Sequence, residues 1–163
     1  MRKHTLLMIL TAAALLFAAC GEKTAPTVSL YDLTRDMCAA DHALPSMSSI
    51  SSSDEKAAEL FTYFADFDYE KVDAYYLSYA ADGAPFELGV IALKDASDVK
   101  ACEDALKAHI EGRVNLYKSY APDYVPQAEQ ADVLTEGRYV ALVMCKDRTA
   151  AGQAFFTFLR AQQ

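Results

Sequence analysis

The sequence has few of the residue groupings on which catalytic and metal centres are built. Its only histidines are His4, His42 and His109, too few for a histidine-based metal centre. None of its four cysteines stands in a C-x-x-C pair, so neither zinc-ligand spacing nor a thioredoxin-like motif is present. No serine stands in G-x-S-x-G, the setting of a hydrolase nucleophile. The sequence therefore leaves any catalytic residue unidentified, and it predicts no metal ligand and no cofactor.

Loops that hold phosphate or calcium are also missing. The glycines are isolated from one another, whereas a phosphate-binding loop needs several within a few residues. Acidic residues do recur between positions 66 and 73, but an EF-hand loop counted from Asp66 would need glycine and glutamate where the chain has Lys71 and Leu77. This segment is interpreted as a solvated connector, with a calcium site of another kind as the alternative.

The chain has no hydrophobic run long enough to cross a membrane. Its longest apolar stretch, residues 6–19, has 14 residues, against the roughly 20 that a spanning helix needs. Arg2 and Lys3 precede this stretch and small residues end it, which is typical of a secretory signal. Residues 1–19 are therefore predicted to be a signal peptide that is removed.

A cysteine follows that stretch directly. Phe17-Ala18-Ala19-Cys20 resembles the lipobox of bacterial lipoproteins, in which the cysteine thiol receives a diacylglycerol, although Phe17 stands where leucine is usual. Two long acyl chains hold a protein stably on a bilayer. The prediction is lipidation at Cys20, a lipidated tether over 20–28 and one domain over 29–163, held on the outer face of the bacterial cytoplasmic membrane. The alternative is an ordinary secretion signal with an incidental cysteine.

Basic residues are outnumbered. The chain has 15 lysines and arginines against 23 acidic residues, and loss of Arg2 and Lys3 would change the net charge from −8 to −10. An acidic surface repels nucleic acid and anionic lipid headgroups. No nucleic-acid partner is expected, membrane contact is assigned to the lipid on Cys20, and a cell-wall or envelope protein is the expected partner.

The apolar spacing predicts an α+β domain. A helix follows Ser29, a serine-rich linker covers 46–56, and a short helix leads to Phe64. Two strand-strand-helix units follow, with strands at 72–80, 86–94, 131–135 and 139–145, a long helix from about 95 to 120, and a last helix after Thr149. The simplest arrangement is a two-layer sandwich, a four-stranded antiparallel sheet with the helices packed on one face.

Three stretches of this part of the chain carry a family resemblance. FELGVIALKDASDVKACEDAL at 86–106, SYAPDY at 119–124 and TEGRYVALVM at 135–144, together with Arg113, resemble a family of small Gram-positive lipoproteins described only as a domain of unknown function. The resemblance covers roughly two thirds of the mature chain. It implies a location at the cell surface and brings no known activity or site.

One cluster is a candidate binding site. Arg113 lies within the apolar arc of the long helix, and Tyr117 and Tyr120 follow it, while Tyr139 lies across the predicted fold. Aromatic faces beside an arginine suit a glycan, a peptide or an anionic small ligand. These four residues are the candidate ligand contacts, and the structural alternative is an Arg-Tyr hydrogen-bond cluster that fixes the helix to the sheet.

These observations favour a non-enzymatic domain that binds a ligand or partner in the cell envelope. The alternative is a cell-wall hydrolase or accessory factor that uses carboxylates brought together by the fold. Apart from Cys20, the chain has three cysteines: Cys38, Cys102 and Cys145. One pair of these could form a disulfide. Buried free thiols are favoured because Cys102 and Cys145 fall in apolar stretches.

Overall fold

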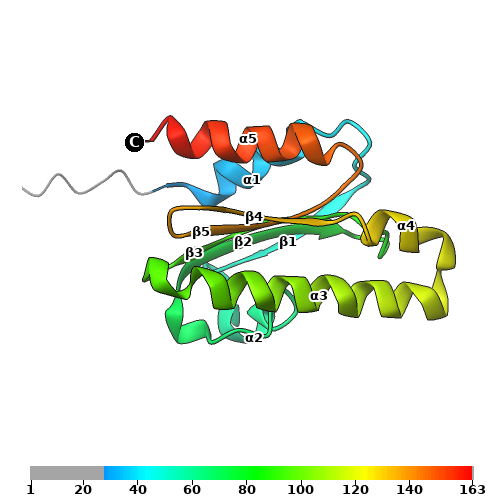
Figure 1. Ribbon diagram of the computed structural model, residues 1–163, viewed down its shortest axis with the longest axis horizontal. Coiled ribbons are helices and arrows are strands. Elements are labelled where there is room, and N and C mark those ends of the chain that lie inside the picture. The colour runs from blue at the N-terminus through cyan, green and yellow to red at the C-terminus, as the bar shows by residue number, and fades with distance from the viewer. Residues whose placement is uncertain (1–27, 163) are drawn as a thin grey trace, which may run out of the picture.

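The computed structural model describes residues 28–162, so the predicted signal peptide, Cys20 and nearly all of the tether lie outside the described residues. Five helices and five strands make up the described chain (Figure 1). In chain order they are α1 (Leu30–Ala39), β1 (Met47–Ser51), α2 (Ala57–Phe61), β2 (Val72–Ala80), β3 (Glu87–Leu93), α3 (Val99–Tyr120), α4 (Val125–Ala128), β4 (Asp132–Glu136), β5 (Tyr139–Met144) and α5 (Arg148–Arg160).

The domain is α+β, as predicted, but its antiparallel sheet has five strands rather than four. The strand order is β1-β2-β3-β5-β4, and β1 pairs with β2 from Met47 opposite Ala80 to Ser51 opposite Tyr76. The serine-rich segment predicted as a linker therefore contains an edge strand. Backbone groups form these ladder bonds whatever the side chains are, and Met47 and Ile50 were the only apolar signals in the segment.

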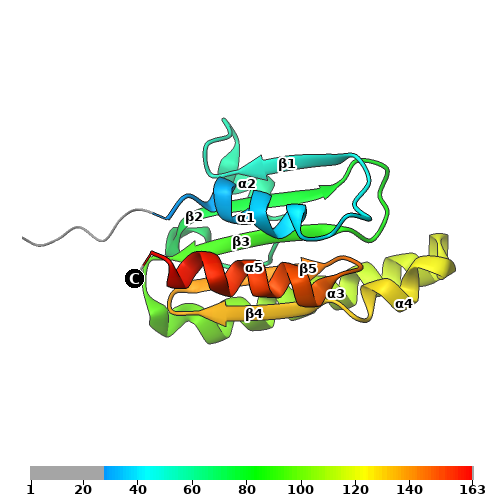
Figure 2. The same cartoon turned by 90° about the horizontal axis from the view of Figure 1, so that it is seen from above.

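The prediction that helices cover one face of the sheet is wrong. α1 and α5 lie on one face, and α2 and α3 lie on the other (Figures 1 and 2). Alternate residues of β3 point to opposite faces, so Leu88 and Val90 pack with α1 and α5 while Ile91 and Leu93 pack with α2 and α3. Every residue of β3 is buried, which requires helices on both faces.

Local signals placed most elements correctly. The Ser29 hydroxyl caps α1 by accepting a hydrogen bond from the Asp32 amide at 3.2 Å. Helix α3 ends at Tyr120 because Ala121, the residue before Pro122, leaves the helical region. The β4-β5 turn has Gly137 at a φ of 57°, in the left-handed region that glycine adopts without strain.

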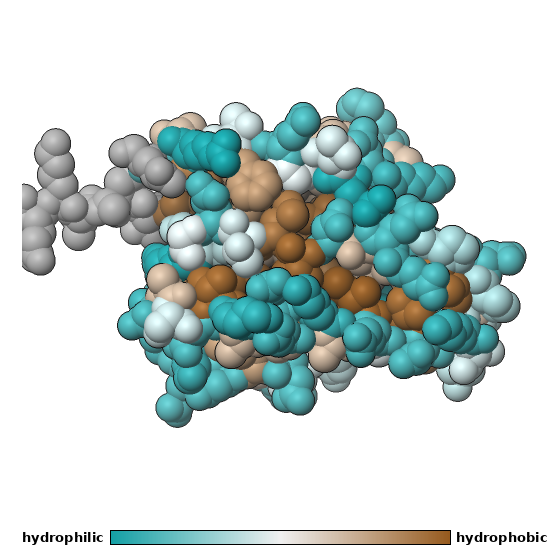
Figure 3. Space-filling model, viewed as in Figure 1, coloured by the Kyte–Doolittle hydropathy of each residue, from teal (hydrophilic) through white to brown (hydrophobic). Residues whose placement is uncertain are grey.

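The described residues hold three clusters of buried hydrophobic side chains. All three clusters lie between Leu30 and Leu159. On the face drawn in Figure 3, hydrophobic side chains gather between the two helical layers and hydrophilic ones cover the outside. Among the helices of residues 28–162, none is both long and apolar enough to cross a membrane.

The three cysteines of the described chain are free thiols. Cys102 and Cys145 are buried, and Cys38 is half-buried. Loss of solvent on burial raises the pKa of Cys102 and that of Cys145 to about 12. Both therefore stay protonated at neutral pH and act as small apolar side chains, because the thiolate is the reactive form.

Candidate functional site

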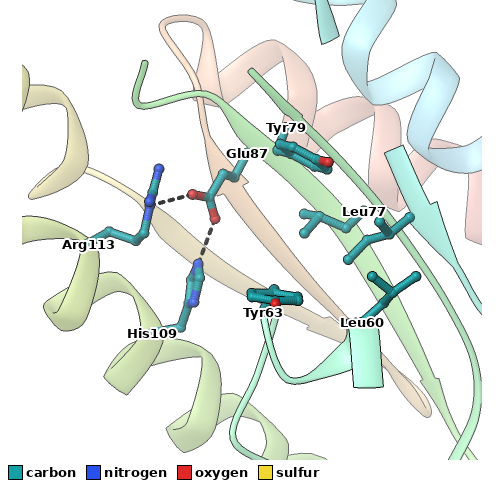
Figure 4. Close-up of a pocket in the computed structure, with 8 residues that line it drawn as sticks. Leu60, Tyr63, Leu77, Tyr79, Glu87, His109 and Arg113 are labelled. Atoms are coloured by element: carbon teal, nitrogen blue, oxygen red, sulfur yellow. Dashed lines mark hydrogen bonds and ion pairs between the residues drawn. The ribbon is translucent and has the colours of Figure 1, made fainter. Parts of the chain in front are cut away.

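A cavity of about 340 Å³ lies on the face of the sheet that α2 and α3 cover. It falls within the range of about 300 to 1,000 Å³ typical of small-molecule sites. Strands β1, β2 and β3, helix α3 and the segment from α2 to Tyr63 all contribute to its wall. Eight side chains line it (Figure 4): Ile50, Leu60, Tyr63, Leu77, Tyr79, Glu87, His109 and Arg113.

Glu87 organises the polar end of this cavity. It is the first residue of β3, and its side chain is only 6% exposed. Its Oε1 lies 2.6 Å from Nε of Arg113, and its Oε2 lies 2.6 Å from Nε2 of His109. His109 and Arg113 are four residues apart on α3, so the helix presents both to the same carboxylate. The three side chains form a cluster that joins the helix to the sheet.

Arg113 is held from a second side by a tyrosine. Its Nη2 donates a hydrogen bond of 2.5 Å to the Tyr117 hydroxyl, which in turn donates to the carbonyl oxygen of Gly83 at 3.1 Å. The guanidinium carbon lies 4.9 Å from the centre of the Tyr117 ring. Burial raises the pKa of Tyr117, so this hydroxyl keeps its proton and remains a donor. The chain of contacts fixes α3 to the turn between β2 and β3.

The cluster has unused donors and a fully engaged carboxylate. Each oxygen of Glu87 already faces a nitrogen, whereas Arg113 Nη1 has no hydrogen-bond partner among residues 28–162. The buried Nε of Arg113 is close enough to Glu87 for an ion pair, but its N–H is not aligned for a hydrogen bond. A guanidinium offers five N–H donors. A ligand could therefore form hydrogen bonds with the free N–H donors of Arg113 more readily than with the oxygens of Glu87.

The opposite end of the cavity is apolar. Figure 4 shows the charged cluster on one side, Leu60 and Leu77 on the other, and the Tyr63 ring between them. Leu77 is buried, Leu60 is half-buried, and Tyr63 is 68% exposed at the rim. The wall therefore changes from polar to apolar along the cavity, which suits a molecule with one polar and one apolar end.

The structure brings together only two of the residues predicted as ligand contacts. Arg113 lines the cavity, and the Tyr117 hydroxyl accepts a hydrogen bond from Arg113. Tyr120 is 82% exposed and is not part of the cavity wall. Tyr139 begins β5 opposite Ala92, at the far end of β3 from Glu87. Glu87 and Ala92 are five positions apart on β3, which is roughly 17 Å of strand. The tyrosine-edged cleft expected around all four residues therefore does not form, and the alternative cluster of Arg113 with Tyr117 does.

The sequence analysis missed Glu87 and gave His109 no role. Two signals were available. Glu87 is the one charged residue in the apolar stretch from Phe86 to Leu93, and a single charge in such a strand needs a partner. His109 and Arg113 have helical spacing that places both on one face. Which strand that face would meet depended on the register of the sheet.

The fold and the cavity define an α+β domain with an open antiparallel sheet covered by helices on both faces. The chain belongs to the family described as a domain of unknown function (DUF4358), which matches residues 46–145. This range contains all five strands and all eight residues of the cavity wall, and leaves α1 and α5 outside. The resemblance to an uncharacterised domain family is thereby confirmed. No curated protein and no solved structure matches the chain.

Within 28–162, no three histidine, cysteine, aspartate or glutamate side chains are grouped closely enough to bind a metal ion. In the cavity wall, Glu87 and His109 are the only residues of these four types, and they contact each other.

Proposed function

We propose that this protein is a lipid-anchored, extracytoplasmic domain that binds a small ligand in the cavity between α2 and α3. The observation that carries this proposal is the cluster of Glu87, His109 and Arg113 at one end of an apolar cavity. Removing charged groups from water costs free energy, and here the partly desolvated charged groups lie in the wall of a cavity. A few convergent polar groups in an apolar cavity are typical of ligand sites.

The location rests on the amino-terminal segment. The signal-like stretch and the lipobox-like Phe17-Ala18-Ala19-Cys20 support lipid attachment at Cys20 on the outer face of the bacterial cytoplasmic membrane. Because the core among the described residues begins at Leu30, only a short tether would separate a lipid on Cys20 from the domain. A ligand or protein of the cell envelope would then be within reach of the cavity.

The hydrolase alternative receives less support from this cavity. Glycoside hydrolysis uses two carboxyl groups about 5 to 9.5 Å apart. Of the eight residues that line the cavity, only Glu87 carries a carboxylate, and both of its oxygens contact nitrogen atoms. The geometry favours binding over hydrolysis.

Metabolic labelling with a radioactive fatty acid tests the anchor. We expect the intact protein to incorporate label, Cys20→Ala to lose it, and Cys38→Ala, the matched control within the folded domain, to keep it. Equal labelling of the intact protein and Cys20→Ala would exclude lipidation at this position.

A thermal-shift screen of segment 24–163, which contains all three clusters of buried side chains described above, tests the binding function. The compounds are small amphiphiles, cell-wall fragments and short peptides. A ligand at a hundred times its Kd stabilises the folded state by about 2.7 kcal/mol, enough to raise the melting temperature by several degrees. At least one class should do so.

Two leucine variants show whether the ligand occupies this cavity. Leu60→Asp places a charge in the apolar wall, and Leu116→Asp, on the exposed side of α3 and outside the cavity wall, is its control. The shift should disappear in Leu60→Asp and persist in Leu116→Asp. A shift that survives in both would place the ligand elsewhere, and no shift with any compound would count against the function.

A further inference from the structure

We infer that the ligand is a small amphiphile with a single anionic group, a medium-chain carboxylate in its simplest form. The anion would lie against Arg113, and the apolar chain would lie between Leu60 and Leu77. This inference rests on the proposed binding function and adds the chemical class of the ligand.

The free hydrogen-bonding groups at the polar end select the head group. Nη1 of Arg113 has no partner among the described residues, while both oxygens of Glu87 already face nitrogen atoms. A ligand that brings acceptors finds donors here, and a ligand that brings donors meets a carboxylate already engaged. The planar fork of a guanidinium fits a carboxylate, and hydrogen bonds between charged partners are roughly twice as strong as neutral ones.

The neighbouring cluster keeps the guanidinium in place for such an anion. Glu87 holds Nε, Tyr117 holds Nη2, and the Tyr117 ring lies beside the guanidinium plane. Both contacts fix the arginine before a ligand arrives, so little side-chain freedom remains to be lost on binding. His109 occupies the second oxygen of Glu87 and so limits the freedom of that carboxylate to turn toward the ligand.

The volume of the cavity limits the length of the chain. One water molecule takes about 30 Å³ of liquid volume, so 340 Å³ has room for about eleven non-hydrogen atoms. Octanoate has ten. Each additional buried methylene should tighten binding about fourfold until the cavity is full. Hexanoate should therefore bind about sixteenfold more weakly than octanoate, and dodecanoate should gain little over octanoate.

Calorimetric titration of segment 24–163 with three matched probes tests the head group. Octanoate, octanol and octylammonium share the same chain and differ in the charge of the head. We expect octanoate to bind at least tenfold more tightly than either of the others. Affinities for octanol or octylammonium within twofold of that for octanoate would overturn the inference and leave the binding function standing.

Substitutions at the cavity separate the role of the arginine from its role in folding. Arg113→Lys keeps the charge and loses the fork, so octanoate should bind about tenfold more weakly while octanol is unchanged. Arg138→Gln, at a half-buried arginine that is paired with Asp73 and lies outside the cavity wall, is the control and should leave both affinities unchanged. Unchanged octanoate affinity in Arg113→Lys would contradict the proposed position of the anion.

A second variant covers the case in which Arg113→Lys does not fold. Leu60→Asp leaves the Glu87 cluster intact and should abolish octanoate binding, because it places a negative charge beside the chain. Suppose that no carboxylate binds, but that another compound binds and Leu60→Asp abolishes its binding. The inferred chemical class of the ligand is then wrong, and the binding site is correct. If no compound binds at all, both the inference and the proposed function fail.

Discussion

Glu87 on β3 and Arg113 on α3 form an ion pair whose Oε1 and Nε atoms are 2.6 Å apart, with the two side chains 6% and 25% exposed. The pair formed by Asp73 and Arg138 has the same separation, 2.6 Å, but its side chains are 49% and 37% exposed. The two ion pairs therefore have the same separation but differ in their exposure to solvent. Water screens the second pair far more than the first, so the two pairs should differ in what their loss costs.

Glu87→Gln should destabilise the domain by about 2 to 3 kcal/mol. Breaking a fully buried pair costs about 3 to 5 kcal/mol, and the partial exposure of Arg113 lowers that figure. Asp73→Asn, the matched change in the exposed pair, should cost at most about 1 kcal/mol. Urea unfolding of the two variants measures the difference. Equal losses would show that the cavity does not shield the Glu87 pair from water.

Tyr117→Phe tests whether the tyrosine fixes α3 to the β2-β3 turn. The change removes the hydroxyl that accepts from Arg113 and donates to the Gly83 carbonyl, and a lost hydrogen bond of this kind costs about 1 to 2 kcal/mol. Tyr120→Phe, on the same helix but 82% exposed, should have almost no effect. Chemical denaturation compares them, and a Tyr117→Phe variant as stable as Tyr120→Phe would remove the tyrosine from this role.

Most of the secondary structure could be predicted because its signals are local. Ser29 caps α1, Pro122 stops α3, and Gly137 allows the β4-β5 turn, all within a few residues of the element concerned. The arrangement of helices about the sheet depends instead on which faces are buried. The apolar runs that follow Glu87 in β3 and fill β5 already indicated burial on both faces, since a strand covered on one side alternates apolar with polar residues.

The site was harder to predict because it depends on register. Arg113 and His109 could be placed on one helix face from their spacing, but their partner Glu87 is set by how far α3 runs along β3. The same uncertainty misplaced Tyr139. Tyr139 pairs with Ala92 rather than with a residue near Glu87. The sequence alone does not fix the register, that is, which residues of two paired antiparallel strands lie opposite each other.

Gly89 should tolerate no side chain. A Cβ atom at this position would lie 2.8 Å from Cζ of Phe64 and 2.9 Å from the backbone oxygen of Tyr76, and the backbone of a central strand has little room to move. Gly89→Ala should therefore cost about 1 to 3 kcal/mol through overpacking.

The control for this prediction is Gly112→Ala. A Cβ atom at Gly112, on the exposed side of α3, meets nothing within 4 Å. Alanine is favoured over glycine in a helix interior by about 1 kcal/mol, so this variant should be more stable than the natural chain. Thermal melting should thus shift in opposite directions for the two substitutions. Shifts in the same direction would mean that the close contacts at Gly89 relax easily.

Asp41 joins the end of α1 to the segment between β5 and α5. Its side chain is buried, and it accepts hydrogen bonds from the backbone amides of Ala43 at 2.9 Å, Lys146 at 2.7 Å and Asp147 at 3.1 Å. Burial alone would raise the pKa of this carboxyl, but hydrogen bonds from the three amides and from the Cys145 thiol together hold the pKa below its usual value. The ionised form of Asp41 is therefore the one that stabilises the fold.

The pH dependence of stability follows from that shift. Because the pKa is lower in the folded state, the stabilisation is fully present above the unfolded-state value of about 3.9 and is lost as the pH falls through the folded-state value. Asp41→Asn should be less stable than the natural chain by about 1 to 3 kcal/mol at pH 7, since one acceptor oxygen is replaced by a donor that faces other donors. Asp66→Asn, at an exposed carboxylate, is the control and should change stability by less than about 0.5 kcal/mol.

Urea unfolding from pH 7 downward should show that the stability difference between Asp41→Asn and the natural chain narrows only below about pH 4, where the natural carboxyl takes up its proton. A gap that narrows well above that pH, or that stays constant as the chain is acidified, would mean that the amides do not bind the ionised carboxylate of Asp41.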